Sequence, residues 1–304
     1  MLGLGSSLTA GSVISGLEWS ATKYLYLPGA NGDFARVQGF NSFLNRISDS
    51  GSDDIADTIT ISFWVTPIWV MGNVGANQHV TTGGGTANAV WFPVFGNTDT
   101  EKDRIRIYYH IDTGSGTDKN RLVVQAVDAS GNKEMDEAFI HSTNNSATGV
   151  GSSLTSAVGS GSGWWNVSNK GNVNGSDFVH LCFTRNSGDW TIYWNGNALG
   201  SPVDADSGTL SFDESNVDEF WIGKSFVNQE YIKMGYRDIA YFNSTLNASE
   251  VEQLYNSGTF FDVRTHSKAD DLGLYWPCQD EQEFSGAGSS ANLDLQGNSQ
   301  FSDL

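Results

Sequence analysis

The sequence predicts an all-β protein, a two-sheet antiparallel jelly-roll sandwich with one short surface helix. Segments in which apolar and polar residues alternate recur along the chain, and this period of two is typical of half-buried strands. Only one segment has the apolar spacing of a helix, so strands and helices do not alternate as they do in an α/β fold. The chain also has 35 glycines and only 5 prolines, which indicates many tight turns.

The clearest strands are predicted at residues 58–65 and 104–111. In the first, every second residue from Ile59 to Val65 is apolar, which turns one face towards a core. In the second, the apolar residues alternate with an outward row made of Arg104, Arg106, Tyr108 and His110. Further strands are predicted at residues 24–28, 91–95, 121–127, 178–185, 190–194, 219–223 and 236–242.

Turn and cap chemistry predicts one hairpin and one helix. The pair Asn195-Gly196 follows the strand at 190–194, and Asn-Gly tolerates the positive φ angles that a type I′ turn requires. Asn247 is a good N-cap, and Glu250 three residues later completes a capping box. Gly258 is placed to end this helix.

The length of 304 residues fits one large all-β domain. We predict an N-terminal docking segment at residues 1–21, a role inferred from its place outside the sandwich, and the sandwich itself at residues 22–304. Two stretches near 68–85 and 142–175 are rich in Gly, Ser, Asn and Thr and are predicted as loop insertions, which often carry recognition on a rigid β scaffold. A C-terminal flanking strand is predicted near 272–298.

Charge and cysteine content narrow the classes of partner and compartment. The net charge of −19 argues against nucleic acid, because a polyanion would be repelled. The two cysteines, Cys182 and Cys278, are too few for a disulfide framework and are predicted as free thiols. The first residues lack the basic region and the apolar stretch of a signal peptide, and no apolar run is long enough to span a membrane. We therefore expect synthesis in a host cytoplasm and no membrane insertion.

Four segments, at residues 24–37, 59–67, 178–196 and 222–255, follow one family pattern in order. The third contains WTIYWNG, and the fourth runs from Ile222-Gly223 to the helix. Together they resemble a laminin-G-like domain of the concanavalin A-like lectin and glucanase superfamily. The resemblance implies a lectin-like sandwich that binds carbohydrate. Arg237-Asp238-Ile239 lacks one acidic residue of the family's usual cluster, which argues against carrying a cation site over to it.

The tail extends the resemblance. Residues 272–277, then Asp280 and Glu281, then residues 293–298 are similar to a strand that flanks such domains in bacteriophage structural proteins. This similarity implies a virion protein.

Because the superfamily includes glycoside hydrolases, the sequence must be tested for their carboxylates. A retaining hydrolase needs two carboxyl groups about 5–5.5 Å apart, and the family's enzymes carry alternating acids on one strand. The nearest match places Glu134 and Asp136 on one face, with Glu137 pointing the other way. The third acid would fall at Ala138 or Phe139 and is missing. The sequence therefore predicts no enzyme.

Three groups of residues remain as candidate sites. The pair Trp164-Trp165 lies in a Gly- and Ser-rich stretch, where the rings either stack on a sugar or are buried by the loop or a neighbouring subunit. The outward row from Arg104 to His110 is either a ligand or interface face or an ordinary solvated one. Calcium is the one cofactor considered, with oxygen ligands from Asp53, Asp54, Asp57, Asp99 and Asp103. Tryptophans in or beside strands, at positions 69, 91, 190, 194 and 221, are predicted as core.

The leading hypothesis is a non-catalytic virion structural protein, such as a capsid decoration, fibre or tail-associated subunit. Its expected partners are other virion proteins or copies of itself, together with cell-surface polysaccharide. The alternative is a stand-alone carbohydrate-binding adhesin module, and glycoside hydrolysis is the weakest reading.

Overall fold

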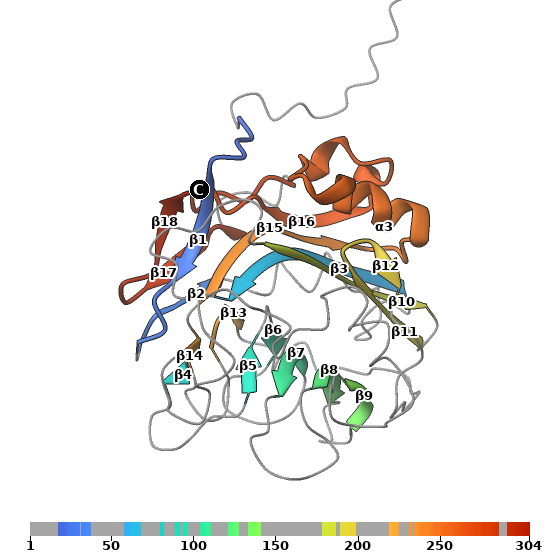
Figure 1. Ribbon diagram of the computed structural model, residues 1–304, viewed down its shortest axis with the longest axis horizontal. Helices are drawn as coiled ribbons and strands as arrows, with labels where there is room; N and C mark the ends of the chain where they lie inside the picture. Colours follow the sequence, from blue (N-terminus) through green and yellow to red (C-terminus); the bar gives the residue numbers. More distant parts are fainter. Residues whose placement is uncertain are drawn as a thin grey trace, which may run out of the picture.

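Two antiparallel sheets stack on each other to form the protein, as the computed structural model shows in Figure 1. One short α-helix, α3, lies on the outside of the upper sheet in this view. The predicted all-β sandwich with one short helix is confirmed. The structure describes residues 18–30, 32–37, 58–67, 80–81, 89–91, 94–96, 104–110, 121–127, 133–140, 178–186, 189–198, 219–224, 231–232, 234–285 and 291–304.

The upper sheet, called sheet A below, has β3 and β15 at its centre. Its strand order is β12 (Asn197–Ala198), β11 (Asp189–Trp194), β10 (Val179–Asn186), β3 (Thr58–Pro67), β15 (Met234–Phe242), β1 (Lys23–Leu27) and β18 (Gln300–Asp303). A further strand, β16 (Leu272–Trp276), pairs with the second half of β15.

The lower sheet, called sheet B below, is built around β7. Its order is β17 (Leu293–Gln296), β2 (Phe34–Val37), β13 (Glu219–Ile222), β6 (Val94–Gly96), β7 (Arg104–His110), β8 (Arg121–Val127) and β9 (Lys133–Ile140). Strand β5 (Ala89–Trp91) also pairs with β7. The segment predicted as one strand at 91–95 is thus two strands, β5 and β6. A separate pair joins β4 (Val80–Thr81) to β14 (Tyr231–Ile232), so part of the predicted loop at 68–85 is a strand.

Aromatic side chains fill the space between the two sheets. Phe220 of sheet B stacks on Trp276 of sheet A with ring centroids 5.2 Å apart, and Tyr241 meets both rings edge-on. Trp190 and Trp194 are buried, as predicted, whereas Trp69 lies outside the described residues and Trp91 is described only as backbone. Large aromatic rings bury about 150–250 Å² each, so this layer dominates the hydrophobic stabilisation.

The outer face of sheet A is covered by α3 (Ala248–Tyr255) and three short 3₁₀ turns, η4 (Asn256–Gly258), η5 (Val263–Thr265) and η6 (Ala269–Asp271). Asn247 caps α3 and exchanges hydrogen bonds with Glu250, which confirms the capping box. The helix ends at Asn256 rather than at Gly258. Asn256 itself takes the left-handed conformation with φ 46° and caps the last turn, a role that asparagine shares with glycine.

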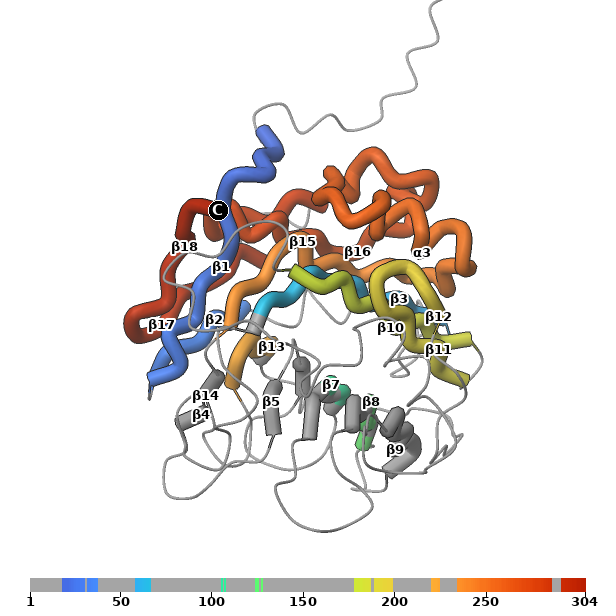
Figure 2. Tube along the Cα trace, in the orientation of Figure 1, coloured from blue at the N-terminus to red at the C-terminus, as the bar shows by residue number. Residues whose placement is uncertain are grey.

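The C-terminal residues complete both sheets. β17 is the edge strand of sheet B and β18 is the edge strand of sheet A, with residues 297–299 between them. Figure 2 shows this red end of the chain beside the blue strands β1 and β2. The side chain of Asp33 accepts hydrogen bonds from the backbone of Ala30 and Asn298 and so fixes the crossing. The segment near 272–298, for which the sequence suggested one flanking strand, holds two strands of the sandwich, β16 and β17.

Within the described part of the chain, no helix combines the length and the apolar character needed to cross a membrane.

Candidate functional site

The strand register aligns a row of mostly polar positions across the outer face of sheet B. Residues directly opposite each other in antiparallel strands share a face. Phe220 and Ile105 are buried and face sheet A, so their neighbours Trp221 and Arg106 belong to the opposite, outer face. The row, called the sheet-B row below, consists of Asp294, Arg36, Trp221, Val94, Arg106, Gln125 and Asp136.

One end of the sheet-B row is open to solvent. Arg36 Nε lies 2.9 Å from Asp294 Oδ2, and the two side chains are 27% and 38% exposed. An ion pair this exposed contributes at most about 1 kcal/mol to stability. Its hydrogen-bonding groups can therefore be shared with a bound molecule at little cost to the fold.

Next to this pair, a lysine covers two aromatic rings. Lys224 Nζ lies 3.8 Å from the ring centroid of Trp221 and 4.5 Å from that of Phe34. The two rings meet edge-on at 5.7 Å. Trp221 is buried, as the sequence predicted, but on the outer face of sheet B rather than between the sheets. The cation above the rings makes that position favourable, because a lysine attracted to an aromatic face also shields it from water.

Gln125 lies further along the row, between the positions of Arg106 and Asp136. It is 1% exposed, and within the described part of the chain its side-chain oxygen has no hydrogen-bond partner. An unpaired buried carbonyl costs about 1–3 kcal/mol, so this oxygen is a destabilising group in the fold.

The predicted outward row of β7 belongs to this same surface. The register places the positions of Arg104, Arg106, Tyr108 and His110 on the outer face of sheet B. Their side chains lie outside the described part, so their role in binding stays a prediction. The other candidates lie wholly outside the described residues, namely Trp164, Trp165, Asp53, Asp54, Asp57, Asp99 and Asp103.

Sequence reasoning missed four members of this surface: Arg36, Trp221 as an outer residue, Lys224 and Asp294. These residues come from three separate parts of the chain, and only the pairing of β2 with β13 and β17 brings them together. The one sequence signal that could have found Arg36 is the alternation in the segment FARV. It turns Arg36 to the face opposite to that of its buried neighbours in the chain.

The register places two acidic positions of β9 on opposite faces of sheet B. Asp136 pairs with Gln125 on the outer face, whereas Glu137 pairs with buried Val124 on the inner one. Glu134 lies at an irregularity in the register, and the pairing assigns it to neither face. Among the described residues, no group of three or more His, Cys, Asp or Glu side chains could hold a metal ion.

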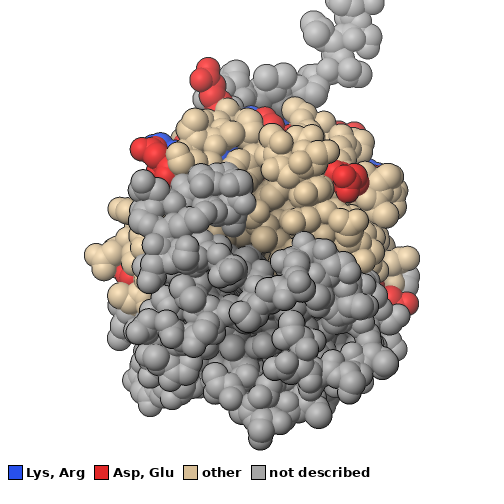
Figure 3. All heavy atoms as spheres, viewed as in Figure 1, with Lys and Arg blue, Asp and Glu red and all other residues tan. Residues whose placement is uncertain are grey.

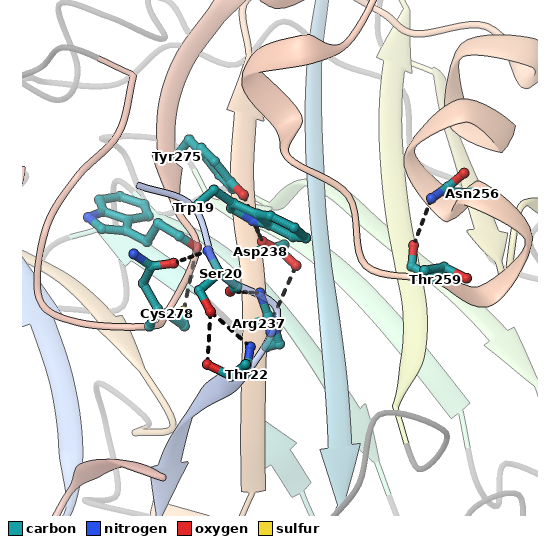
Figure 4. Close-up of polar contacts among 11 residues, drawn as sticks. Trp19, Ser20, Thr22, Arg237, Asp238, Asn256, Thr259, Tyr275 and Cys278 are labelled. Carbon is teal, nitrogen blue, oxygen red and sulfur yellow. Dashed lines mark hydrogen bonds and ion pairs between the residues drawn. The ribbon is translucent and has the colours of Figure 1, made fainter. Parts of the chain in front are cut away.

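A second polar cluster lies on the opposite side of the sandwich, on sheet A (Figure 4). Asp238 is buried and accepts hydrogen bonds from Trp19 Nε1 at 3.2 Å, Tyr275 Oη at 2.7 Å and Arg237 Nε at 3.3 Å. Burial raises the pKa of Asp238, while the charge of Arg237 and the three donors act to lower it. The bulge in β15 makes this geometry, with Asp238 at φ 45°.

This cluster holds the chain at residues 18–22. Arg237 Nη2 donates to the backbone oxygen of Ser20 at 2.9 Å, and Gln279 bonds the backbone of both Glu18 and Ser20. Every carboxylate oxygen contact of Asp238 is thus made within the fold. The cluster is therefore a structural clamp that ties residues 18–22 to sheet A.

A family model described as the concanavalin A-like lectin/glucanases superfamily matches residues 110–252. No curated protein matches the chain.

Solved structures with a similar course of the chain are distant. A protein from Bacteroides ovatus ATCC 8483, to which carbohydrate binding has been provisionally assigned, is 11% identical, with 95% of this chain and 61% of that one covered and a TM-score of 0.46. This chain thus spans less than two thirds of that protein's length. A heptameric SAP-like pentraxin from Limulus polyphemus is 11% identical, with 77% and 82% covered and a TM-score of 0.39. The binding domain of botulinum neurotoxin DC, solved with rat synaptotagmin II, is 15% identical, with 81% and 46% covered and a TM-score of 0.42.

The two stacked antiparallel sheets are of the kind that this family model, which matches just under half of the chain, describes.

Proposed function

We propose that the protein is a non-catalytic, carbohydrate-binding subunit of a virus particle, and that it binds glycan on the outer face of sheet B. The observation that carries the binding half is the exposed Arg36–Asp294 pair at the end of the sheet-B row. The family match at residues 110–252 supports it.

The chemistry of the row suits a sugar. Each hydroxyl of a sugar both donates and accepts a hydrogen bond, so it pairs well with neighbouring groups of opposite character. Arg36 offers donors beside the acceptor oxygens of Asp294. Binding through such groups requires no reacting carboxylate.

The absence of catalysis is supported by β9. A glycosidase needs two carboxyl groups on one face flanking the bond that is cleaved. The third acid of the family's enzymes is missing at Ala138 and Phe139, and the register places the positions of Asp136 and Glu137 on opposite faces of sheet B.

The assembly half rests on the resemblance of residues 272–298 to bacteriophage structural proteins. A second candidate is a stand-alone adhesin module that uses the same face. Glycan binding is common to the virion subunit and the adhesin module, so binding and assembly are tested in separate experiments.

A glycan array tests the binding half with wild type, Arg36→Ala and Lys23→Ala. Lys23 is an exposed lysine on β1 of sheet A, so Lys23→Ala also removes one positive charge but from outside the sheet-B row. We expect Arg36→Ala to weaken binding by about tenfold or more, the value of one hydrogen bond to a charged group, and Lys23→Ala to leave it unchanged. Wild type without affinity for any glycan contradicts the proposal.

Mass spectrometry of gradient-purified virus particles tests the assembly half. Peptides of this chain in fixed proportion to a major capsid protein are expected. Glycan binding by a protein that is absent from particles would favour the adhesin instead.

A further inference from the structure

We propose that the protein has a second glycan site, for a neutral oligosaccharide, at the corner where the β11–β12 hairpin meets the end of α3. This corner, called the hairpin–helix corner below, consists of residues 195–197 and 255–260. It lies on the outer side of sheet A, across the sandwich from the Arg36–Asp294 pair. It is therefore a site in addition to the one in the proposed function.

The ring of Tyr255 lies flat against sheet A. It stacks on Trp64 of β3, with ring centroids 5.9 Å apart and an angle of 26° between the planes, and on His180 of β10, at 6.1 Å and 30°. Trp64 and His180 are buried, whereas Tyr255 is partly exposed. Since one face of the tyrosine ring is turned to the sheet, its other face is turned away from the core. A flat aromatic face offers apolar contact to the C–H groups of a sugar ring.

Two glycines flank the ring of Tyr255. A Cβ on Gly196, at the tip of the hairpin, would come within 3.0 Å of Tyr255 Cδ1, and a Cβ on Gly258 would lie 3.4 Å from Tyr255 Oη. The tyrosine therefore reaches from the hairpin tip to the turn that follows the helix. It joins two distant parts of the chain into one surface.

Left-handed backbone is concentrated at this corner. Five non-glycine residues of the described chain have a positive φ, and three of them lie here: Asn195 at 48°, Asn256 at 46° and Ser257 at 54°. The type I′ turn requires the first, and the end of the helix requires one left-handed residue, which Asn256 supplies. Ser257 has neither role. Strained residues of this kind cluster at binding sites, where they hold side chains in place for a ligand.

Uncharged polar groups lie on both sides of the ring. Asn197, Asn256, Ser257 and Thr259 are exposed. The amide nitrogens of Asn197 and Asn256 each donate to a nearby backbone oxygen, at 3.0 and 3.3 Å, and Figure 4 shows the second bond, to Thr259. These bonds hold the side chains, while both amide oxygens and the Ser257 hydroxyl have no hydrogen-bond partner within the described part of the chain. Sugar hydroxyls can donate to all three.

A second aromatic ring stands upright beside the first. Phe260 is partly exposed and meets Trp64 at an angle of 86° with centroids 5.2 Å apart, whereas Tyr255 is nearly parallel to Trp64. Arg237 lies 4.3 Å from the centre of the Phe260 ring, but it is buried and paired with Asp238, so its charge is balanced within the fold. A ligand longer than one sugar can contact both rings.

The charges near the corner favour a neutral ligand. Residues 190–198 and 253–261 contain no charged side chain, although the whole chain has 35 acidic and 16 basic residues. Figure 3 likewise shows acidic groups standing singly among uncharged residues on the described surface of this view. The exposed carboxylate of Glu252 lies beside Gly196. It can accept hydrogen bonds from sugar hydroxyls and repels an anionic sugar.

Titration calorimetry with neutral oligosaccharides tests the inference. The probes are gluco-, xylo-, manno- and galacto-oligosaccharides of one to six sugars. We expect at least one series to bind, tetramers more tightly than monomers, and the affinity to change less than twofold between low and high salt, because no ion pair is formed. Arg36→Ala should retain this binding, since Arg36 lies on sheet B. If no neutral series binds, the inference is wrong.

The double variant Asn256→Gly/Ser257→Gly removes two polar side chains from the corner. Glycine suits the left-handed backbone at both positions, so the variant should unfold at the same or a higher urea concentration than wild type. We expect it to bind the oligosaccharide about tenfold more weakly or worse, the value of two hydrogen bonds. Asn243→Ala removes an exposed amide beyond the other end of α3 and is the matched control, which should stay within twofold.

The outcomes separate this site from the proposed one. Full binding by the double variant, or an equal loss in Asn243→Ala, overturns the inference. Glycan binding that Arg36→Ala alone weakens overturns it as well, while leaving the proposed function intact. Loss in the double variant alone supports the corner and contradicts the site on sheet B. Unchanged glycan binding with lower occupancy of virus particles would show that the corner contacts another subunit, which also overturns the inference.

Discussion

At the scale of single residues, His180 shows how burial fixes a protonation state. It lies on β10 against the rings of Trp64 and Tyr255, with centroids 5.0 and 6.1 Å away, and its Nε2 is 2.8 Å from the hydroxyl of Ser62. Burial lowers the pKa of His180 to about 3. The imidazole is therefore neutral in the folded protein at any pH that the sandwich meets in a cell.

This lowered pKa makes stability depend on pH in one direction. Above a pH of about 6.5 the imidazole is neutral in both the folded and the unfolded chain. As the pH falls below 6.5, only the unfolded chain takes up the proton until about pH 3, so stability is lost across that window. We expect the free energy of unfolding of His180→Phe to fall less steeply than that of wild type, by about 1.4 kcal/mol per pH unit between pH 6 and 4.

Urea unfolding at half-unit steps of pH measures both slopes. The phenylalanine retains an aromatic ring against Trp64 and Tyr255. Above pH 7.5 the free energies of unfolding of the two proteins should therefore depend on pH in parallel. Identical slopes between pH 6 and 4 would show that His180 is protonated in the fold.

At the scale of elements, the β11–β12 hairpin is fixed both by its own turn and by α3. Asn195 and Gly196 have φ angles of 48° and 76°, which confirms the predicted type I′ turn. A Cβ on Gly196 would also collide with the carboxylate of Glu252 and come within 3.0 Å of Tyr255 Cδ1. The sequence revealed the turn chemistry, but not that a helix packs against the tip of the hairpin.

Gly196→Ala tests the contact between the hairpin and α3, and Gly32→Ala is its matched control. Gly32 has φ 96°, yet no atom lies within 4 Å of its would-be Cβ, so its substitution carries backbone strain alone. We expect Gly32→Ala to lower the free energy of unfolding by about 1 kcal/mol and Gly196→Ala to lower it by about 2 kcal/mol or more. Thermal and urea unfolding measure the difference, and equal losses would mean that α3 does not press on the hairpin.

At the scale of the whole molecule, the C-terminal strands β17 and β18 join the two sheets. β17 pairs with β2 in sheet B, β18 pairs with β1 in sheet A, and Leu304 bonds back to Thr22. Buried Leu293 and the bond from Trp276 Nε1 to Ala291 connect the same segment to the core. Both sheets should therefore unfold together as one cooperative unit.

Deletion of residues 293–304 tests this cooperativity. We expect the shortened chain to lose the native near-ultraviolet circular dichroism of its aromatic core and to show no cooperative urea transition. Deletion of residues 1–17, which take part in none of the described strand pairings, serves as the control and should unfold with the midpoint of the full chain. A shortened protein that keeps a sharp unfolding transition would show that the two sheets unfold cooperatively without β17 and β18.

The sequence by itself determined the elements with a local cause. Alternation determined β3, β7 and β8, Asn-Gly determined the hairpin, and the Asn247–Glu250 box determined where α3 begins. Each of these signals lies within about ten residues of chain. The missing third acid after Asp136 was likewise readable from the sequence alone.

Only the tertiary structure decided which positions share a face. Arg36, Trp221 and Asp294 are separated by more than 70 residues of chain at each step, and no local pattern relates them. Antiparallel pairing sets them in one row, and the position of Arg106 lies in the same row. The alternation in the sequence had already predicted that Arg106 faces outward. The physical reason is that register is set by long-range burial of alternate residues, and this burial exists only after the strands have met.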